Sequence, residues 1–331
     1  MHCSSQKSYT DMKQQLLGID IGGTKCAVIF GLDTDGVVSI ADKVRFDTAD
    51  VHSTIARILS ELKAMCARHG LDASNTHGIG ISCGGPLDSR RGVVMSPPNL
   101  PGWDNIPIVK LVQDATGIPA ALQNDANACA LAEWKYGAGR GTRNMVFLTF
   151  GTGLGAGLVL DGKLYSGTND NAGELGHIRL SEFGPVGYGK AGSVEGFASG
   201  GGIAQLAASA VKEKLMMGEK VDWCPDGNLS AISARTVAEA AKAGDELAKS
   251  VYRTSATYLG KALAMVIDIL NPEVIAIGSI FVRAEDLIRP FMQAAIDRDA
   301  LPGAAAVCKV KPAELGESIG DIAALSLAAT L

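Results

Sequence analysis

The stretch Leu16-Leu17-Gly18-Ile19-Asp20-Ile21-Gly22-Gly23-Thr24-Lys25 decides the fold. Its apolar residues predict a buried strand that ends near Asp20, and its glycine pair predicts a tight turn. Residues 26–30 predict the returning strand, and the turn residues 33–36 lead into a third strand near 37–40. A glycine turn between two strands leaves backbone amides open, and such amides can surround a phosphate.

The same unit returns later in the chain. Residues 145–150 predict a strand, 151–155 a glycine turn and 156–160 a returning strand, and Asp161-Gly162 then leads into 163–165. Two such units about 130 residues apart indicate two similar α/β domains. The alternation of strands and helices along the rest of the chain also favours an α/β fold.

The two domains are expected at residues 14–121 and 122–317. The last helix, about 318–331, is a candidate to pack back on the first domain. Apolar periodicity predicts the helices, at 51–69 (ending at Gly70), 126–136, 198–217, 233–243, 244–270, 285–297 and from about 320 onward.

Composition excludes several classes of protein. The chain has 331 residues with 47% hydrophobic and 20% charged residues, which is typical of a folded globular protein rather than a disordered one. Its 40 glycines exceed the usual frequency and indicate many tight turns or close backbone approaches. The net charge of −5 offers no basic surface for nucleic acid or an anionic membrane, so we expect neither as a partner.

The cysteines and the N-terminus favour a cytoplasmic protein. The seven cysteines are odd in number, are scattered and form no Cys-x-x-Cys pair, which indicates reduced thiols rather than disulfides or a zinc ribbon. The first residues contain no apolar leader, and no stretch reaches the ~18 apolar residues of a membrane span.

The glycine turns leave two interpretations open. No Gly-x-x-x-x-Gly-Lys-Ser/Thr motif is present, which excludes a P-loop. Residues 151–156 match a loose dinucleotide motif, but a strand follows where that motif requires a helix. The turns are therefore either ordinary hairpin turns or anion cradles to which Thr24 and Thr152 add hydroxyls.

Several acidic residues are candidates for chemistry. Asp20 ends the first strand and Asp125 begins a helix, so each is either a local turn or cap residue or a functional carboxylate. Glu174 and His177 are three residues apart and could share a face as metal ligands, although a single pair supplies only two. Glu195 lies in a glycine-rich stretch, where a solvated loop charge is the alternative.

Five motifs together make the chain resemble the ROK family of sugar kinases and sugar-responsive repressors. They occur in the family's order and at fitting distances, as Asp20-Ile-Gly-Gly-Thr-Lys25, Gln123-Asn-Asp-Ala-Asn-Ala128, Gly151-Thr-Gly-Leu-Gly-Ala-Gly157, Gly173-Glu-Leu-Gly-His177 and Asn271-Pro-Glu-Val-Ile275. The resemblance implies a duplicated actin-like ATPase (ribonuclease H-like) fold, with two domains around a nucleotide and sugar cleft. It also implies a homodimer.

The resemblance also implies roles for individual residues. ATP would be bound by Asp20, Gly22, Gly23, Thr24, Lys25, Gly151, Thr152, Gly153 and Gly278, with Mg²⁺ held near Asp20 through water. The sugar would be bound by Gly85, Asn99, Asn124, Asp125, Glu174, His177 and Glu195. Asp125 would be the catalytic base that takes the proton of the acceptor hydroxyl.

Two departures from the family pattern alter these expectations. Many members carry a Cys-x-Cys-Gly-x-x-Gly-Cys zinc motif, but here its cysteine positions are Val186, Tyr188 and Ser193. We therefore expect no zinc and expect His177 to serve the sugar. After Asn271-Pro-Glu273 the family commonly has a run of glycines near the adenine, but here only Gly278 is present, followed by Ser279. The residues that contact the adenine are therefore not predicted from the family pattern.

The expected activity is ATP-dependent phosphorylation of the 6-hydroxyl of a hexose, with glucokinase as the first candidate. Kinases of N-acetylmannosamine, fructose, mannose or allose remain alternatives, as does a non-catalytic sugar sensor. Repressors of the family carry an additional helix-turn-helix region before the first motif. The 19 residues that precede Asp20 are too few for such a domain, so we expect an enzyme.

Overall fold

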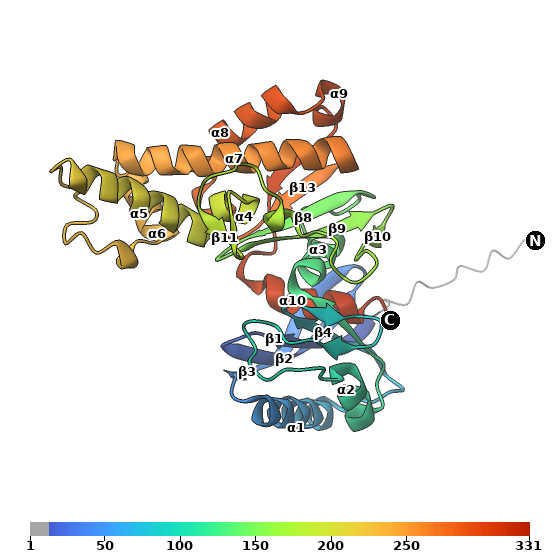
Figure 1. Cartoon of the computed structure of the whole chain (residues 1–331). Coiled ribbons are helices and arrows are strands. Elements are labelled where there is room, and N and C mark those ends of the chain that lie inside the picture. Colours follow the sequence, from blue (N-terminus) through green and yellow to red (C-terminus); the bar gives the residue numbers. More distant parts are fainter. Residues whose placement is uncertain (1–12) are drawn as a thin grey trace, which may run out of the picture. The chain divides into compact units, whose positions relative to one another are not determined.

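The computed structural model describes residues 13–331, so the predictions made for Cys3 and for the first residues of the chain lie outside the described residues. The chain forms two compact units (Figure 1). The first contains the residues up to Tyr136 together with Glu317–Leu331, and the second contains Gly137–Gly316.

The first unit is built on a five-stranded sheet with the order β3-β2-β1-β4-β7. The first three strands are antiparallel, whereas β4 and β7 run parallel to β1. Both faces of its central strands are buried, as their nearly continuous apolar sequences require. The strands are β1 (Lys13–Ile21), β2 (Lys25–Thr34), β3 (Val37–Asp47), β4 (Thr76–Cys83) and β7 (Ala120–Asn124), with a separate small hairpin of β5 (Leu87–Asp88) and β6 (Val93–Val94).

Helices cover both faces of this sheet. Helices α1 (Val51–His69) and α2 (Ile108–Thr116) share one hydrophobic core with it, and α10 (Ile319–Ala328) packs on the opposite face. The bounds predicted for α1 are confirmed: Asp50 caps its first turn, and Gly70 ends it in the left-handed conformation with φ 64°. Helix α3 (Asp125–Tyr136) packs against α10 and belongs to this unit, although the sequence placed it in the second domain.

Glycines on the central strands allow α10 to lie close to the sheet. A Cβ atom at Gly80 would lie 2.0 Å from the carbonyl oxygen of Ala324, and one at Gly18 would lie 2.9 Å from the Ala324 Cβ. Real Cβ atoms essentially never approach other atoms this closely. Part of the glycine excess therefore comes from this helix–sheet contact rather than from turns.

The second unit repeats the topology of the first. Its sheet has the order β10-β9-β8-β13-β14, with the first three strands antiparallel and with β13 and β14 parallel to β8. The predicted duplication of the strand–turn–strand unit is therefore confirmed. The strands are β8 (Met145–Phe150), β9 (Leu154–Leu160), β10 (Lys163–Leu164), β13 (Val274–Ile277) and β14 (Lys309–Pro312).

The helices of the second unit surround the long helix α7 (Glu246–Leu270), which is orange in Figure 1. Its buried face packs on the neighbouring helices and the sheet. These are α4 (Val194–Phe197), α5 (Gly200–Met216), α6 (Ala234–Lys242), α8 (Ile280–Asp299) and α9 (Pro302–Ala305). The helix expected at 285–297 lies within α8, where the non-helical backbone of Ala284 (φ −134°) separates the first turn from the rest. None of the helices within 13–331 has the length and apolarity that a membrane span requires.

Candidate active site

The first glycine turn has its carbonyl groups bound and its amides open. The Gly22 N–H donates to the Lys25 carbonyl at 3.0 Å, while Thr48 binds the Gly22 carbonyl through its hydroxyl and the Thr24 carbonyl through its N–H. Among residues 13–331, the N–H groups of Gly23 and Thr24 donate to no protein acceptor. Open amides in a turn attract an anion, so this turn fits a phosphate group.

Asn99 connects the first turn with the glycine turn after β4. A Cβ atom at Gly23 would lie 2.6 Å from the Asn99 carbonyl oxygen, and one at Gly84 would lie 3.3 Å from the Asn99 side-chain oxygen. Gly85, the next residue, has no atom within 4 Å of the position of a Cβ. The predicted sugar residues Asn99 and Gly85 therefore lie near the predicted phosphate residue Gly23.

Asp20 is the principal charged residue beside this turn. Burial raises the pKa of its carboxyl group to about 6, and the negative charges of Asp321 and Asp125 contribute in the same direction. Lys43 and Arg45 oppose this shift. A carboxylate that is held ionised against burial and repulsion gains from a cation, and oxygen ligands of this kind suit Mg²⁺.

Asn124 and Asp125 lie where β7 meets α3, and the structure separates their roles. The Asn124 side chain accepts the Asn127 N–H at 2.7 Å, so Asn124 caps the helix. Within the part of the chain that the structure describes, the Asp125 carboxylate accepts a hydrogen bond only from the N–H of its neighbour Ala126, at 2.8 Å, and Asp125 is exposed to solvent. Desolvation by the surrounding protein raises the pKa of the Asp125 carboxyl group. The cap interpretation thus belongs to Asn124, and Asp125 keeps lone pairs for a substrate.

The second glycine turn resembles the first in its hydrogen bonding. The N–H groups of Gly200 and Gly201, at the start of α5, donate to the carbonyls of Gly151 (2.8 Å) and Thr152 (3.1 Å). Within the described part of the chain, the N–H groups of Thr152 and Gly153 have no protein acceptor. The two turns are therefore equivalent both in topology and in the amides that they leave open.

Glu195 lies against the second turn. Its carboxylate oxygen Oε2 accepts the Leu154 N–H at 3.0 Å, and a Cβ atom at Gly153 would lie 2.7 Å from that oxygen. A Cβ at Gly176 would lie 3.3 Å from the Glu195 Cβ and 2.2 Å from the Leu154 carbonyl oxygen. The glycines are thus required for this close approach, and the interpretation of Glu195 as a solvated loop charge is wrong.

The other two predicted sugar residues of this unit lie on the segment that contains Gly176. Glu174 precedes the short 3-10 helix η1 (Leu175–His177), and both Glu174 and His177 are exposed. The segment lies beside β9, because the Ala156 N–H on that strand donates to the Gly173 carbonyl at 3.1 Å. Glu174, His177 and Glu195 are therefore neighbours of the second glycine turn, with two side chains open to solvent.

Gly278 lies at the end of β13, next to the second turn. Its N–H donates to the Leu148 carbonyl at 3.0 Å, and Phe147 packs against it. Ser279 begins α8 with a positive φ of 55° and accepts a hydrogen bond from Arg283 at 3.1 Å. A Cβ at Gly151 would lie 3.7 Å from the Ser279 hydroxyl, so Gly278 and Ser279 lie beside the predicted phosphate residues.

The positions of the family's zinc cysteines do not suit a metal. Ser193 is buried and caps α4, Val186 is bound through its backbone, and Tyr188 is 74% exposed. Among residues 13–331 no group of three or more His, Cys, Asp or Glu side chains could hold a metal ion. Valine, tyrosine and serine lack the thiolates of a structural zinc site, so the residues present do not fit zinc.

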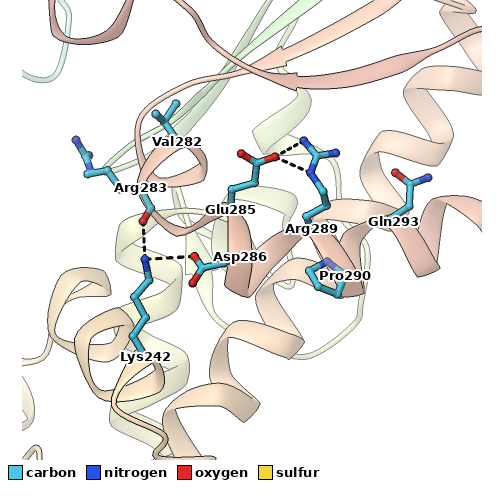
Figure 2. A pocket seen from close by; sticks show the side chains of 8 residues that line it. All are labelled: Lys242, Val282, Arg283, Glu285, Asp286, Arg289, Pro290 and Gln293. Carbon is cyan, nitrogen blue, oxygen red and sulfur yellow. Dashed lines mark hydrogen bonds and ion pairs between the residues drawn. The ribbon is translucent and has the colours of Figure 1, made fainter.

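A cavity of about 630 Å³ lies apart from these residues, along α8 (Figure 2). Two of its three cationic side chains are in ion pairs: Lys242 binds Asp286 at 3.2 Å, and Arg289 binds Glu285 at 2.5 Å. The third, Arg283, donates to the Ser279 hydroxyl at 3.1 Å. None of the predicted site residues lines this cavity. This cavity is therefore separate from the residues that the motifs predict for the nucleotide and the sugar.

Sequence reasoning missed the ion pair that lies behind Asp20. Lys43 on β3 binds Asp321 on α10 at 2.6 Å, and both side chains are largely shielded from solvent. The two residues are 278 positions apart, so no local pattern could have paired them. A lysine on an otherwise exposed edge strand and an aspartate in an apolar helix were the only signals.

Two α/β units of identical strand order, each with an anion-type glycine turn, define an actin-like ATPase fold. The expected fold class is thereby confirmed. The model of the ROK family matches residues 16–330, and the chain belongs to the ROK family. It is 34% identical over 310 residues to a glucokinase of Halalkalibacterium halodurans, with 92% of each chain covered.

Solved structures of family members share the fold. A glucokinase from Streptomyces griseus, crystallised with glucose and AMPPNP, aligns with a TM-score of 0.74 and 28% identity, covering 96% of this chain and 100% of that one. A ROK family transcriptional regulator, described as a homologue of the E. coli MLC protein, aligns with a TM-score of 0.82 and 28% identity, covering 97% and 78%. Both kinases and regulators are therefore among its relatives.

Proposed function

We propose that this chain is a glucokinase, an ATP-dependent kinase that phosphorylates the 6-hydroxyl group of glucose. Curated glucokinases at 31–34% identity over most of the chain support the kinase class. The observation that carries the proposal is the pair of equivalent glycine turns. In each turn, two carbonyl groups accept hydrogen bonds from elsewhere in the same unit and two neighbouring amides stay open, which suits the phosphates of ATP.

The sugar is proposed to contact residues near both turns. Asn124 has its side-chain oxygen engaged in the helix cap, which leaves its amide NH₂ as the donor for a sugar hydroxyl. Asn99 and the Gly85 backbone complete this side, and Glu174, His177 and Glu195 supply acceptors and donors on the second unit. Carboxylates bind vicinal hydroxyls in two-point hydrogen bonds, which distinguish one epimer from another.

Asp125 is proposed as the catalytic base. Its carboxylate carries only one short backbone hydrogen bond, and its raised pKa makes it a stronger proton acceptor than a solvated aspartate. It would take the proton of the 6-hydroxyl as that oxygen attacks the γ-phosphorus, and the ADP oxygen leaves on the opposite side. The open amides of Gly23, Thr24, Thr152 and Gly153 would stabilise the negative charge of the transferring group.

Asp20 is the proposed anchor for Mg²⁺, through bound water, and Lys25 and Gly278 complete the nucleotide side. When bound, Mg²⁺ supplies charge neutralisation for the phosphates. Lys25 is half-exposed and lies 3.9 Å from Asp47, so it is able to turn toward a phosphate. No zinc enters this proposal, because the residues at the family's cysteine positions do not suit it.

The direct test is release of ADP with Mg-ATP across a panel of hexoses and N-acetylhexosamines, with Asp125→Asn as the control. Turnover on glucose that is lost in the variant, with glucose binding retained in calorimetry, supports the proposal. Turnover on N-acetylmannosamine, fructose, mannose or allose alone would replace glucose by that sugar. Binding of a sugar without any turnover would identify a sensor instead.

The regulator relative and a DNA-binding transcriptional repressor of Escherichia coli, 28% identical over 247 residues, raise one competing function, a DNA-binding role. The net charge of −5 argues against a nucleic-acid surface on this chain. A cytoplasmic location and a homodimer complete the proposal. Gel filtration with light scattering tests the dimer, and a fluorescently labelled promoter-length DNA duplex tests the competing function.

A further inference from the structure

We infer that Gln205 replaces the family's structural zinc ion as the support of the β11–β12 hairpin and thereby positions Glu195 for the sugar. The hairpin consists of β11 (Val186–Gly187) and β12 (Lys190–Ala191) and contains two of the family's three zinc-ligand positions. The sugar part of this inference rests on the proposed function. The mechanical part stands on the geometry of the second unit alone.

The hairpin needs support from outside itself. Each of its strands has only two residues, and short hairpins are marginally stable alone. Its large apolar side chains do not bury much surface, since Val186 is 48% exposed and Tyr188 74%, and Phe183 in the segment before β11 is 84% exposed. Hydrophobic packing therefore does not account for its order.

Gln205, on α5, binds the outer edge of the hairpin at two points. Its side-chain oxygen accepts the Val186 N–H at 2.9 Å, and its Nε2 donates to the Val186 carbonyl at 2.8 Å. The amide thus pairs with the free edge of β11 as a neighbouring strand would. Only a side chain with both a donor and an acceptor can make this pair.

The supported strand lies directly on Glu195. A Cβ atom at Gly187 would lie 2.8 Å from the Glu195 Cβ and 2.5 Å from the Gly196 N, and one at Gly196 would lie 2.2 Å from the Pro185 carbonyl oxygen. No side chain fits between β11 and α4. A displacement of β11 therefore removes one wall of the position that Glu195 occupies.

Ser193, at the third cysteine position of the family motif, also supports this part of the structure. Ser193 is fully buried, accepts the Gly196 N–H at 3.1 Å and lies 3.4 Å from the Gly187 carbonyl, to which it donates. Its hydroxyl thus caps the helix that carries Glu195 and binds it to β11. Lys190 adds a bond from the hairpin to the His177 carbonyl at 2.8 Å.

The test compares Gln205→Ala with Gln293→Ala, a glutamine on α8 whose bond stays within its own helix, to Asp297. Both are helical glutamines, so alanine preserves the fold in each. Hydrogen exchange of residues 183–196 should rise about tenfold in Gln205→Ala only, since two hydrogen bonds are lost. Glucose affinity in calorimetry should fall by a similar factor, with AMPPNP affinity changed less than twofold. Gln205→Glu, which keeps only the acceptor, should behave like the alanine variant.

Three results would overturn the inference. Unchanged exchange in Gln205→Ala removes Gln205 as the support, and increased exchange with unchanged glucose affinity removes its effect on Glu195. A stoichiometric zinc content in the purified wild-type protein, or faster hairpin exchange on adding a chelator, restores a metal support. Wild-type protein that binds no hexose overturns the proposed function instead, and the exchange comparison still decides the role of Gln205.

Discussion

The Oε2 atom of Glu195 accepts the backbone N–H of Leu154 at 3.0 Å. This bond joins a residue proposed for the sugar to the turn proposed for the phosphates, within one unit of the chain. The Leu154 amide follows directly after Thr152 and Gly153, whose own amides are open. A sugar hydroxyl that binds Glu195 is therefore linked by one side chain to the conformation of the phosphate turn.

We expect the two simplest substitutions of Glu195 to separate these roles. Glu195→Gln keeps an oxygen for the Leu154 N–H but loses the charge, so the KM for glucose should rise about tenfold with the KM for ATP nearly unchanged. Glu195→Ala also removes the hydrogen bond to the Leu154 N–H in the glycine turn, so the KM for glucose and the KM for ATP should both rise. Steady-state kinetics with each substrate varied in turn provide the measurement, and an unchanged KM for ATP in Glu195→Ala would contradict the coupling.

The pH dependence of turnover should report on Asp125. A base must be ionised to accept a proton, and desolvation by the surrounding protein raises the pKa of Asp125 above its usual 3.8. The kcat should therefore be constant at neutral pH and fall as the pH is lowered through this raised pKa. The carboxyl group of Asp20, with a pKa raised to about 6, also titrates in this range. Varying the Mg²⁺ concentration separates the two groups, because it should shift the part of the pH profile that comes from Asp20 and leave the part from Asp125 unchanged. An activity that stays flat down to pH 4 would exclude Asp125 as the base.

Much of the fold was predictable because it depends on local patterns. The bounds of α1 follow from apolar periodicity and from Gly70, and the duplicated sheet follows from two similar strand–turn–strand sequences. The kink at Ala284 was not predictable, because alanine favours a continuous helix and neither a proline nor a glycine marks that position.

The residues of the candidate site were predictable from the sequence, but the contacts that hold them in position were not. Asp125 and Glu195 were found through motifs, whereas the division of roles between Asn124 and Asp125 depends on side-chain geometry at the start of α3. Gln205 lies on an exposed helix surface, and only its distance from Val186 shows what it does. Long-range partners of this kind leave no periodicity in the sequence.

Gly80→Ala should destabilise the first unit strongly. The added Cβ would lie 2.0 Å from the backbone oxygen of Ala324, so α10 must move away from the sheet. Overpacking against backbone costs about 3 kcal/mol in the free energy of unfolding. Gly303→Ala is the matched control, since no atom lies within 4 Å of its Cβ position. Urea denaturation measures both, and equal midpoints would show that α10 adjusts without cost.

The ion pair of Lys43 and Asp321 should also raise the free energy of unfolding, because of the attraction between its charges rather than because of side-chain packing. Lys43→Met removes the cation that faces Asp321 at 2.6 Å and leaves a shielded carboxylate near the carboxylate of Asp20. The free energy of unfolding at pH 7 should fall by about 2 kcal/mol, less than for a fully buried pair because Lys43 remains partly exposed.

The combination of Lys43→Met with Asp321→Asn separates charge from packing. The neutral amide has nearly the size of the carboxylate but needs no counter-ion, so the double variant should recover most of the stability that Lys43→Met loses. Urea denaturation of the wild-type protein, the two single variants and the double variant gives the coupling free energy. A double variant that is as unstable as Lys43→Met would assign the loss to the methylene groups of Lys43 packed between β3 and α10, and the ion pair would then have no net effect on stability.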